Sequence, residues 1–256
     1  MTVRRLTGWG RTSPSTAEVL EVADRREAST ALAAVGPRGA LVRGLGRSYG
    51  DAAQNAGGLV LELHSAPKID LDPDTGLVRA GGGTTIDELI RHLVPRGWFV
   101  PVTPGTRQVT VGGAVAADVH GKNHHVDGSW GDHVVELDLL HADGTLQVVT
   151  PTSDPDLFWA THGGMGLTGA VMGCVFRAIP IQSDQVLVDT WRTTDLAETM
   201  AVMADNDGRY RYSVAWIDSL ATGARMGRGV VTMGDHAPHA ALGDAGLRGG
   251  GAVPRH

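Results

Sequence analysis

Short segments of alternating or continuous apolar residues recur along the whole chain, and each predicts a strand or a helix. Strands are expected over residues 17–22, 40–43, 59–63, 69–72, 77–80, 134–141, 146–150, 170–179 and 210–217. Helices are expected over residues 28–34, 89–93, 111–117, 155–161 and 196–203. The two kinds of element follow each other without a regular strand–helix–strand rhythm, which favours an α+β fold over a doubly wound parallel sheet.

Polar residues at the ends of these segments support the assignment. Asp24 and Asp154 stand where a side chain can cap the first turn of a helix, and Thr85 with Glu88 forms a capping box. The short segments between 69–72 and 77–80 and between 134–141 and 146–150 each contain Asp and Gly, which is typical of turns. Both pairs of strands are therefore expected to form hairpins.

The pattern changes after about residue 182. Residues 1–182 contain the glycine-rich loops described below and are expected to form one domain. Residues 183–234 contain a strand, a helix and an aromatic strand, which begin another domain. Residues 235–256 are rich in Gly, Ala and His without periodicity, so we expect a disordered tail.

Composition and charge exclude several classes of protein. The net charge of -6 and the lack of a Lys/Arg run argue against nucleic-acid binding. The single cysteine, Cys174, excludes an internal disulfide. No apolar run approaches the ~20 residues of a membrane span, and Arg4-Arg5 is not followed by the apolar core of a signal peptide. We therefore expect a chain without a signal peptide or transmembrane helix, located in the cytoplasm or peripherally at the cell envelope.

Glycine makes up about twice its usual ~7% share, and the first glycine-rich loop covers residues 43–51. This loop follows a predicted strand and places Arg43, Arg47 and Ser48 among three glycines. Free backbone N–H groups beside arginines form an anion-binding concavity. The alternative interpretation is an ordinary glycine-rich turn.

Two further glycine segments are candidates for ligand binding. Residues 104–114 lead from a loop into a helix whose first turn reads Val-Gly-Gly-Ala. Such a helix N-terminus can bind a diphosphate, although the small residues could equally serve a close helix–helix contact. Residues 164–169 match the dinucleotide fingerprint, but a helix precedes them and a strand follows, which reverses the required order. We therefore reject a Rossmann-type site there.

Residues 120–125, His-Gly-Lys-Asn-His-His, form the densest cluster of chemical groups in the chain. His120 and His124 have a metal-ligand spacing only if they lie on one helix, which Gly121 disfavours, so we expect no metal. Two interpretations remain. One is a solvated polar loop; the other places His120 and Lys122 in a cofactor pocket, where they can transfer protons.

Four motifs, in their order along the chain, resemble one family. They are Arg-Gly-Leu-Gly-Arg-Ser-Tyr-Gly-Asp at 43–51, Pro-Gly-Thr-Arg-Gln-Val-Thr-Val-Gly-Gly at 104–113, His-Gly-Lys-Asn-His-His at 120–125 and Leu-Phe-Trp-Ala-Thr at 157–161. From residue 4 to about 230 the chain resembles the FAD-binding oxidase superfamily of vanillyl-alcohol oxidase and the aldonolactone oxidases. Within that superfamily it is most similar to the decaprenylphosphoryl-ribose 2-oxidases.

The resemblance implies an FAD-binding fold of the PCMH type. Its two subdomains would cover about 1–72 and 73–182, and a substrate or cap domain would begin at 183–234 and be incomplete. The flavin is expected to be non-covalent, because Arg47 stands where covalent members have the histidine that bonds to it. The residues that the resemblance assigns to FAD binding are Arg43, Gly44, Leu45, Gly46, Arg47, Ser48, Tyr49, Gly50, Asp51, Gly105, Thr110, Val111, Gly112, Gly113, Ala117, Asp118, His120 and Val171. The expected catalytic residues are His120, Lys122 and Tyr49.

The implied activity is oxidation of the 2-hydroxyl of a polyprenylphosphoryl-ribose to a 2-keto sugar, in the synthesis of cell-wall arabinan precursors. A short-chain reductase would be the partner that completes the epimerisation, and the lipid substrate would bring peripheral membrane contact. Two alternatives remain open: an oxygen-using alditol or aldonolactone oxidase of the same fold, and a non-catalytic, truncated flavin-binding protein. Because the family's later half covers the flavin, this chain alone is expected to bind flavin weakly and not to turn over.

Overall fold

The computed structural model describes residues 1–63 and 68–242, and the chain in it divides into two compact units. The first unit consists of residues 1–92, 106–119 and 130–178. The second unit consists of residues 93–105, 120–129 and the chain from 179 onward.

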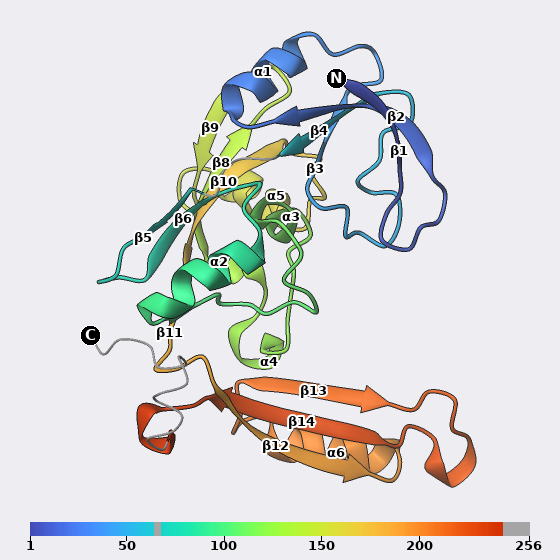
Figure 1. Ribbon diagram of the computed structural model, residues 1–256, viewed down its shortest axis with the longest axis vertical. Coiled ribbons are helices and arrows are strands. Elements are labelled where there is room, and N and C mark those ends of the chain that lie inside the picture. The colour runs from blue at the N-terminus through green and yellow to red at the C-terminus, as the bar shows by residue number, and fades with distance from the viewer. Residues whose placement is uncertain (64–67, 243–256) are drawn as a thin grey trace. The chain divides into compact units, whose positions relative to one another are not determined.

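The first unit begins with a four-stranded sheet in the order β1-β2-β4-β3 (Figure 1). β1 pairs antiparallel with β2, whereas β4 pairs in parallel with both β2 and β3. β4 is buried along its whole length, and it is apolar except for Glu62, whose carboxylate lies beside the Arg4 and Arg43 guanidinium groups. Asp24 caps α1 by accepting a hydrogen bond from the Glu27 N–H, as predicted. The bounds are β1 (Thr2–Leu6), β2 (Ser15–Val22), α1 (Arg25–Ala33), β3 (Ala40–Arg43) and β4 (Leu59–Leu63).

The rest of the first unit is a five-stranded antiparallel sheet, β5-β6-β10-β8-β9, with short helices. The predicted hairpins β5–β6 and β8–β9 lie on either side of β10, and their turns are as expected. The Thr85 N–H donates to Glu88 Oε2 at 2.8 Å, which confirms the capping box before α2. The bounds are β5 (Ile69–Leu71), β6 (Leu77–Gly81), α2 (Ile86–Leu93), α3 (Val111–Ala116), η2 (Trp130–His133), β8 (Val134–Leu140), β9 (Leu146–Val149), α5 (Pro155–Thr161) and β10 (Ala170–Arg177).

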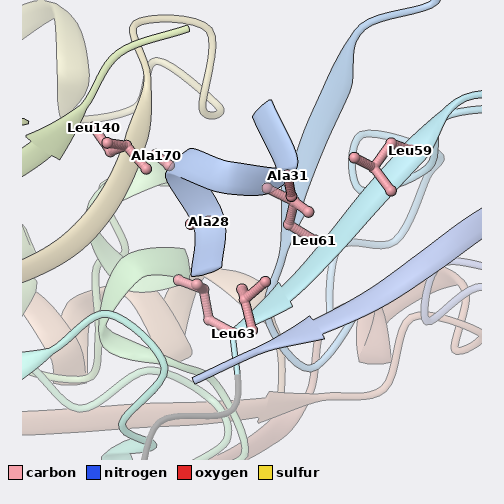
Figure 2. Packing of buried hydrophobic residues seen from close by; sticks show 8 residues of the cluster. Ala28, Ala31, Leu59, Leu61, Leu63, Leu140 and Ala170 are labelled. Atoms are coloured by element: carbon pink, nitrogen blue, oxygen red, sulfur yellow. The ribbon is translucent and has the colours of Figure 1, made fainter. Parts of the chain in front are cut away.

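One apolar cluster joins the two sheets of the first unit (Figure 2). Ala28 of α1 packs with Leu61 of β4, and Leu140 of β8 and Ala170 of β10 belong to the same cluster. Each fully buried leucine contributes about 1.5–3 kcal/mol relative to an exposed one. The elements of the two sheets are therefore held together by a common core.

The second unit contains a three-stranded antiparallel sheet, β12-β14-β13, and the small pair β11–β7. Val231 and Met233 are alternate residues of β14, so they share one face of the sheet, and both are buried. Within residues 1–63 and 68–242, no helix has the length and hydropathy required to span a membrane. The bounds are η1 (Val94–Arg96), β7 (Trp98–Phe99), α4 (His124–Asp127), β11 (Ile179–Pro180), β12 (Val186–Thr193), α6 (Leu196–Asn206), β13 (Tyr212–Ile217), η3 (Gly223–Arg225), β14 (Gly229–His236) and η4 (His239–Ala241).

Two predictions about loops and tails are corrected by the structure. The segment 120–133, expected to be a loop throughout, contains α4 and η2, because the helical turn begins only after Asn123. The tail expected from residue 235 begins later, since β14 continues to His236 by pairing with β12. The remainder of that predicted tail, residues 243–256, lies outside the described residues.

Candidate functional site

A cleft in the first unit is bordered by the first glycine loop, α3 and the segment before β10. Its central part has a volume of about 190 Å³ and includes residues 44–48 together with Thr110 and Ala117 in its lining. Adjoining cavities of about 70 and 440 Å³ share Val42 and Met165 with the central part. The three are lined largely by glycine, alanine and aliphatic residues.

The first glycine loop lines this cleft with available hydrogen-bond donors. Among the described residues, none accepts a hydrogen bond from the backbone N–H of residues 45–48. Gly46 has a φ of 63°, a conformation that glycine adopts without steric cost. Arg47 is exposed, and its guanidinium lies 5.3 Å from the centre of the Trp9 ring. Successive available N–H groups beside a guanidinium can bind an anion such as a diphosphate.

Arg43 supports this loop from the protein interior. Its guanidinium donates to the carbonyl oxygens of Thr7 and Ala53, both at 2.7 Å, and lies 3.8 Å from the Glu62 carboxylate. Burial lowers the pKa of Arg43, and the nearby Glu62 opposes that change. A Cβ at Gly46 would lie 2.1 Å from Arg43 Nη2, so the loop and this side chain fit only with glycine there. Arg43 does not line the cleft; its hydrogen bonds hold the shape of the loop.

The first turn of α3 contributes small side chains instead of available N–H groups. The N–H groups of residues 111–113 donate to the Thr84 carbonyl, the Gly82 carbonyl and the Thr110 hydroxyl, at 2.8, 2.8 and 3.2 Å respectively. Thr110 is therefore a helix cap of the ordinary kind. These three N–H groups already have acceptors within the protein, and the diphosphate contact expected from this turn stays a prediction.

Glycine at this turn serves close packing. A Cβ at Gly112 would lie 3.1 Å from the carbonyl oxygens of both Gly82 and Val171. A Cβ at Gly44 would lie only 2.3 Å from Thr110 Oγ1. The first glycine loop and α3 therefore approach each other closely, and the lack of side chains leaves space along the cleft.

The third glycine segment lines the cleft without being a Rossmann fingerprint. α5 precedes residues 164–169 and β10 follows them, which confirms the reversed order. The N–H groups of Gly163 and Met165 donate to the Val115 and Ala116 carbonyls at 3.1 and 2.8 Å, and so complete the C-terminal end of α3. Met165 has a φ of 52°, which is uncommon for a residue with a side chain.

His120 and Lys122 lie in the second unit, on the loop 120–129. Asn123 is fully buried and anchors this loop, because its side-chain amide donates to the Pro101 carbonyl at 2.6 Å. The side chains of His120 and Lys122 are exposed and can take part in proton transfer. No cluster of three or more metal-ligating side chains is found in the part of the chain that the structure describes.

The structure sorts the expected site residues into three groups. Those that line the cleft are Gly44, Leu45, Gly46, Arg47, Ser48, Thr110, Gly112, Gly113, Ala117 and Val171. Those in the first unit that do not line it are Arg43, Tyr49, Gly50, Asp51, Val111 and Asp118. Gly105, His120 and Lys122 belong to the second unit.

Several cleft residues were missed from the sequence. They are small or apolar, so nothing in their chemistry distinguishes them from core residues; only the glycine run at 164–169 gave a signal. These residues are Val42, Ala52, Ala53, Val109, Ala116, Val119 and Met165 with the four residues after it.

Comparison with known proteins points to FAD, the cofactor that the sequence motifs imply. Residues 16–150 match the family model described as an FAD binding domain. The chain is 45% identical over 239 residues to the decaprenylphosphoryl-β-D-ribose oxidase of Mycolicibacterium smegmatis, covering 91% of this chain and 52% of that protein. It is 48% identical over 158 residues to an uncharacterized Streptomyces coelicolor protein (62% and 42% covered). It is 27% identical over 157 residues to a putative D-arabinono-1,4-lactone oxidase of Neurospora crassa (58% and 28% covered). The chain thus spans about half the length of the first relative, 52%, and less of the other two.

Proposed function

The chain belongs to the family of FAD-binding domains, and on that premise we propose that it is the flavin-binding part of an oxidoreductase acting on a polyprenylphosphoryl-ribose. The reaction is oxidation of the 2-hydroxyl to a 2-keto sugar. The observation that carries this proposal is the 45% identity to a decaprenylphosphoryl-β-D-ribose oxidase across 91% of the chain. The proposal includes a domain organisation. Two α+β subdomains, at about 1–72 and 73–182, would enclose FAD, and a cap domain would begin after them.

The residues of the cleft fit FAD. The available N–H groups of residues 45–48 and the Arg47 guanidinium suit a diphosphate. Gly113 and Ala117 leave room for an extended cofactor beside α3. No histidine stands in the first glycine loop, so the cofactor is held by non-covalent contacts. When bound, FAD supplies the acceptor for the two electrons that the alcohol loses.

The protein itself orients the substrate and handles its proton. In this proposal the imidazole of His120 accepts the proton of the 2-hydroxyl, and the Lys122 ammonium stabilises the negative charge that develops on that oxygen. Tyr49, which is 76% exposed, would contact the substrate from the first glycine loop. The 2-keto product is then a substrate for a reductase, which returns the hydroxyl in the opposite configuration.

The test has two stages on the same purified chain. The first titrates flavin-free protein with FAD and follows the quenching of flavin fluorescence; no binding would overturn the proposal. The second adds polyprenylphosphoryl-ribose to the loaded protein without oxygen and records the flavin absorbance, with a soluble aldonolactone and an alditol as controls. Bleaching by the lipid-linked ribose alone supports the proposal. Bleaching by a control sugar, with hydrogen peroxide released in air, would replace it with a soluble-sugar oxidase.

A further inference from the structure

The loop that carries His120 and Lys122 has a narrow neck. The chain leaves the first unit after Val119 and returns to it at Trp130. The Trp130 N–H donates to the Val119 carbonyl at 2.9 Å. One residue further along the loop, His120 and Ser129 form an antiparallel bridge. The two ends of the loop are therefore held side by side by backbone hydrogen bonds.

Asp118 makes the next contact at this neck. Its Oδ1 accepts a hydrogen bond from the Gly131 N–H at 2.8 Å. Asp118 has a φ of 40°, in the left-handed region that Asp and Asn tolerate better than other residues with side chains. Such strained backbone persists only where surrounding contacts determine it, and it gathers at functional sites.

Gly131 shows how tightly this contact is packed. A Cβ at Gly131 would lie 3.0 Å from Asp118 Oδ1 and 2.9 Å from His162 Cδ2. No side chain fits between these two groups without moving one of them. The carboxylate of Asp118 is thus directed at η2, where the chain returns from the loop, while its neighbours Ala117 and Val119 line the cleft.

We propose that Asp118 is a positioning residue for His120 and Lys122. The inference rests on the proposed function, in which these two side chains handle the substrate proton. The hydrogen bond to Gly131 fixes the spacing of the two loop ends. Without it only the backbone bonds between residues 119 and 130 and between residues 120 and 129 hold the neck, so the neck opens more often and the loop presents its imidazole and ammonium groups less firmly.

Three variants of the full chain separate the side chain of Asp118 from its backbone strain. Asp118→Asn keeps an acceptor oxygen and tolerates the positive φ. Asp118→Gly removes the acceptor and also the strain, and Asp118→Ala removes the acceptor but keeps the strain. The readouts are amide hydrogen exchange at residues 129–131 and the rate of trypsin cleavage after Lys122. Because hydrogen bonds to charged groups are strong, we expect both rates to rise about 10-fold or more in the Gly and Ala variants and to stay within about 3-fold in Asn.

Rates like those of the wild-type chain in Asp118→Gly would overturn the positioning role, as would equal loosening in Asp118→Asn. FAD affinity, measured on the same variants, separates the alternatives. A ligand role predicts weaker FAD binding with unchanged exchange at the neck, and that result would also overturn the proposal. Failure of the wild-type chain to bind FAD would overturn the proposed function, whereas the exchange and cleavage rates still decide whether Asp118 closes the neck.

Discussion

The first glycine loop and the first turn of α3 line the same cleft, yet their glycines serve opposite purposes. In the loop, Gly46 takes a left-handed conformation, and the N–H groups of residues 45–48 have no acceptor among the described residues. In α3, Gly112 allows so close an approach that the N–H groups of residues 111–113 are all bonded within the protein. A cluster of glycines therefore does not reveal whether backbone is opened to a ligand or closed by packing. What distinguishes the two cases is whether the N–H groups of the cluster have acceptors within the protein.

We expect the largest effect from a substitution that disturbs the close packing beside α3. A Cβ at Gly82 would lie 2.0 Å from the Val171 carbonyl oxygen, a backbone atom that can move only if β10 shifts. We expect Gly82→Ala to lower the free energy of unfolding by about 3 kcal/mol, measured by urea denaturation. Gly36→Ala is the control, since a Cβ there meets nothing within 4 Å. Equal urea midpoints for the two variants would show that Gly82 is not packed this closely against β10.

We expect the next largest effect from a substitution at Gly46 in the first glycine loop, and it should act on FAD binding. Gly46→Ala introduces strain at a φ of 63° and places a Cβ 2.1 Å from Arg43 Nη2, so the loop must change shape. We expect FAD to bind about 10- to 100-fold more weakly, which corresponds to losing one or two hydrogen bonds to a charged group. Gly57→Ala is a matched control, because Gly57 has a φ of 70° but an open surrounding and no place in the cleft. If both variants weaken FAD binding equally, general backbone strain is the cause.

Removing the charge of Arg47 while keeping the shape of the first glycine loop should weaken FAD binding by a smaller factor. Arg47 is exposed, so its attraction to a diphosphate is partly screened by solvent and salt. We expect Arg47→Ala to weaken FAD binding about 3- to 10-fold at low salt and to reduce its salt dependence, with urea stability unchanged. Isothermal titration at several salt concentrations measures this. Arg38→Ala, also exposed but outside the cleft, should leave the affinity unchanged.

The smallest expected effect is on the pH dependence of stability, and it involves His162, which lies near the C-terminal end of α3. Burial lowers the pKa of His162, while the Phe158 carbonyl and Asp118 partly oppose this. Since the pKa is lower in the folded state, the unfolded state takes up the proton first as pH falls. The stabilisation is therefore complete above the ordinary histidine pKa of about 6.5 and declines below it. His162→Phe should make urea midpoints less dependent on pH in that range; an unchanged dependence would contradict this. Some dependence should remain, because burial also lowers the pKa of His236.

Local signals in the sequence predicted much of this fold and pointed to several residues that line the cleft. Asp24 and Asp154 cap helices as expected, and both hairpins form around their Asp–Gly turns. What could not be predicted depends on partners distant in sequence. The N–H groups of Val111 and Gly112 look available in the sequence and are used only because Thr84 and Gly82 lie against them. The apolar cleft lining was missed for a similar reason, since its residues resemble any core residues until the elements come together.

The interleaving of the two units has a consequence for the order in which the chain can fold. The chain passes between units at residues 92–93, 105–106, 119–120, 129–130 and 178–179. On the ribosome, β7 emerges well before β11, its only strand partner among the described residues. The carbonyl of Lys122 likewise accepts its hydrogen bond from the N–H of Ser213, which is synthesised later. The segments 93–105 and 120–129 can bond to each other early, but their pairing with β11 and Ser213 must wait for the later part of the chain, and closing such long loops slows folding. Neither unit can be produced as one continuous fragment, so cutting the chain near residue 178 would separate residues 93–105 and 120–129 from the rest of the second unit.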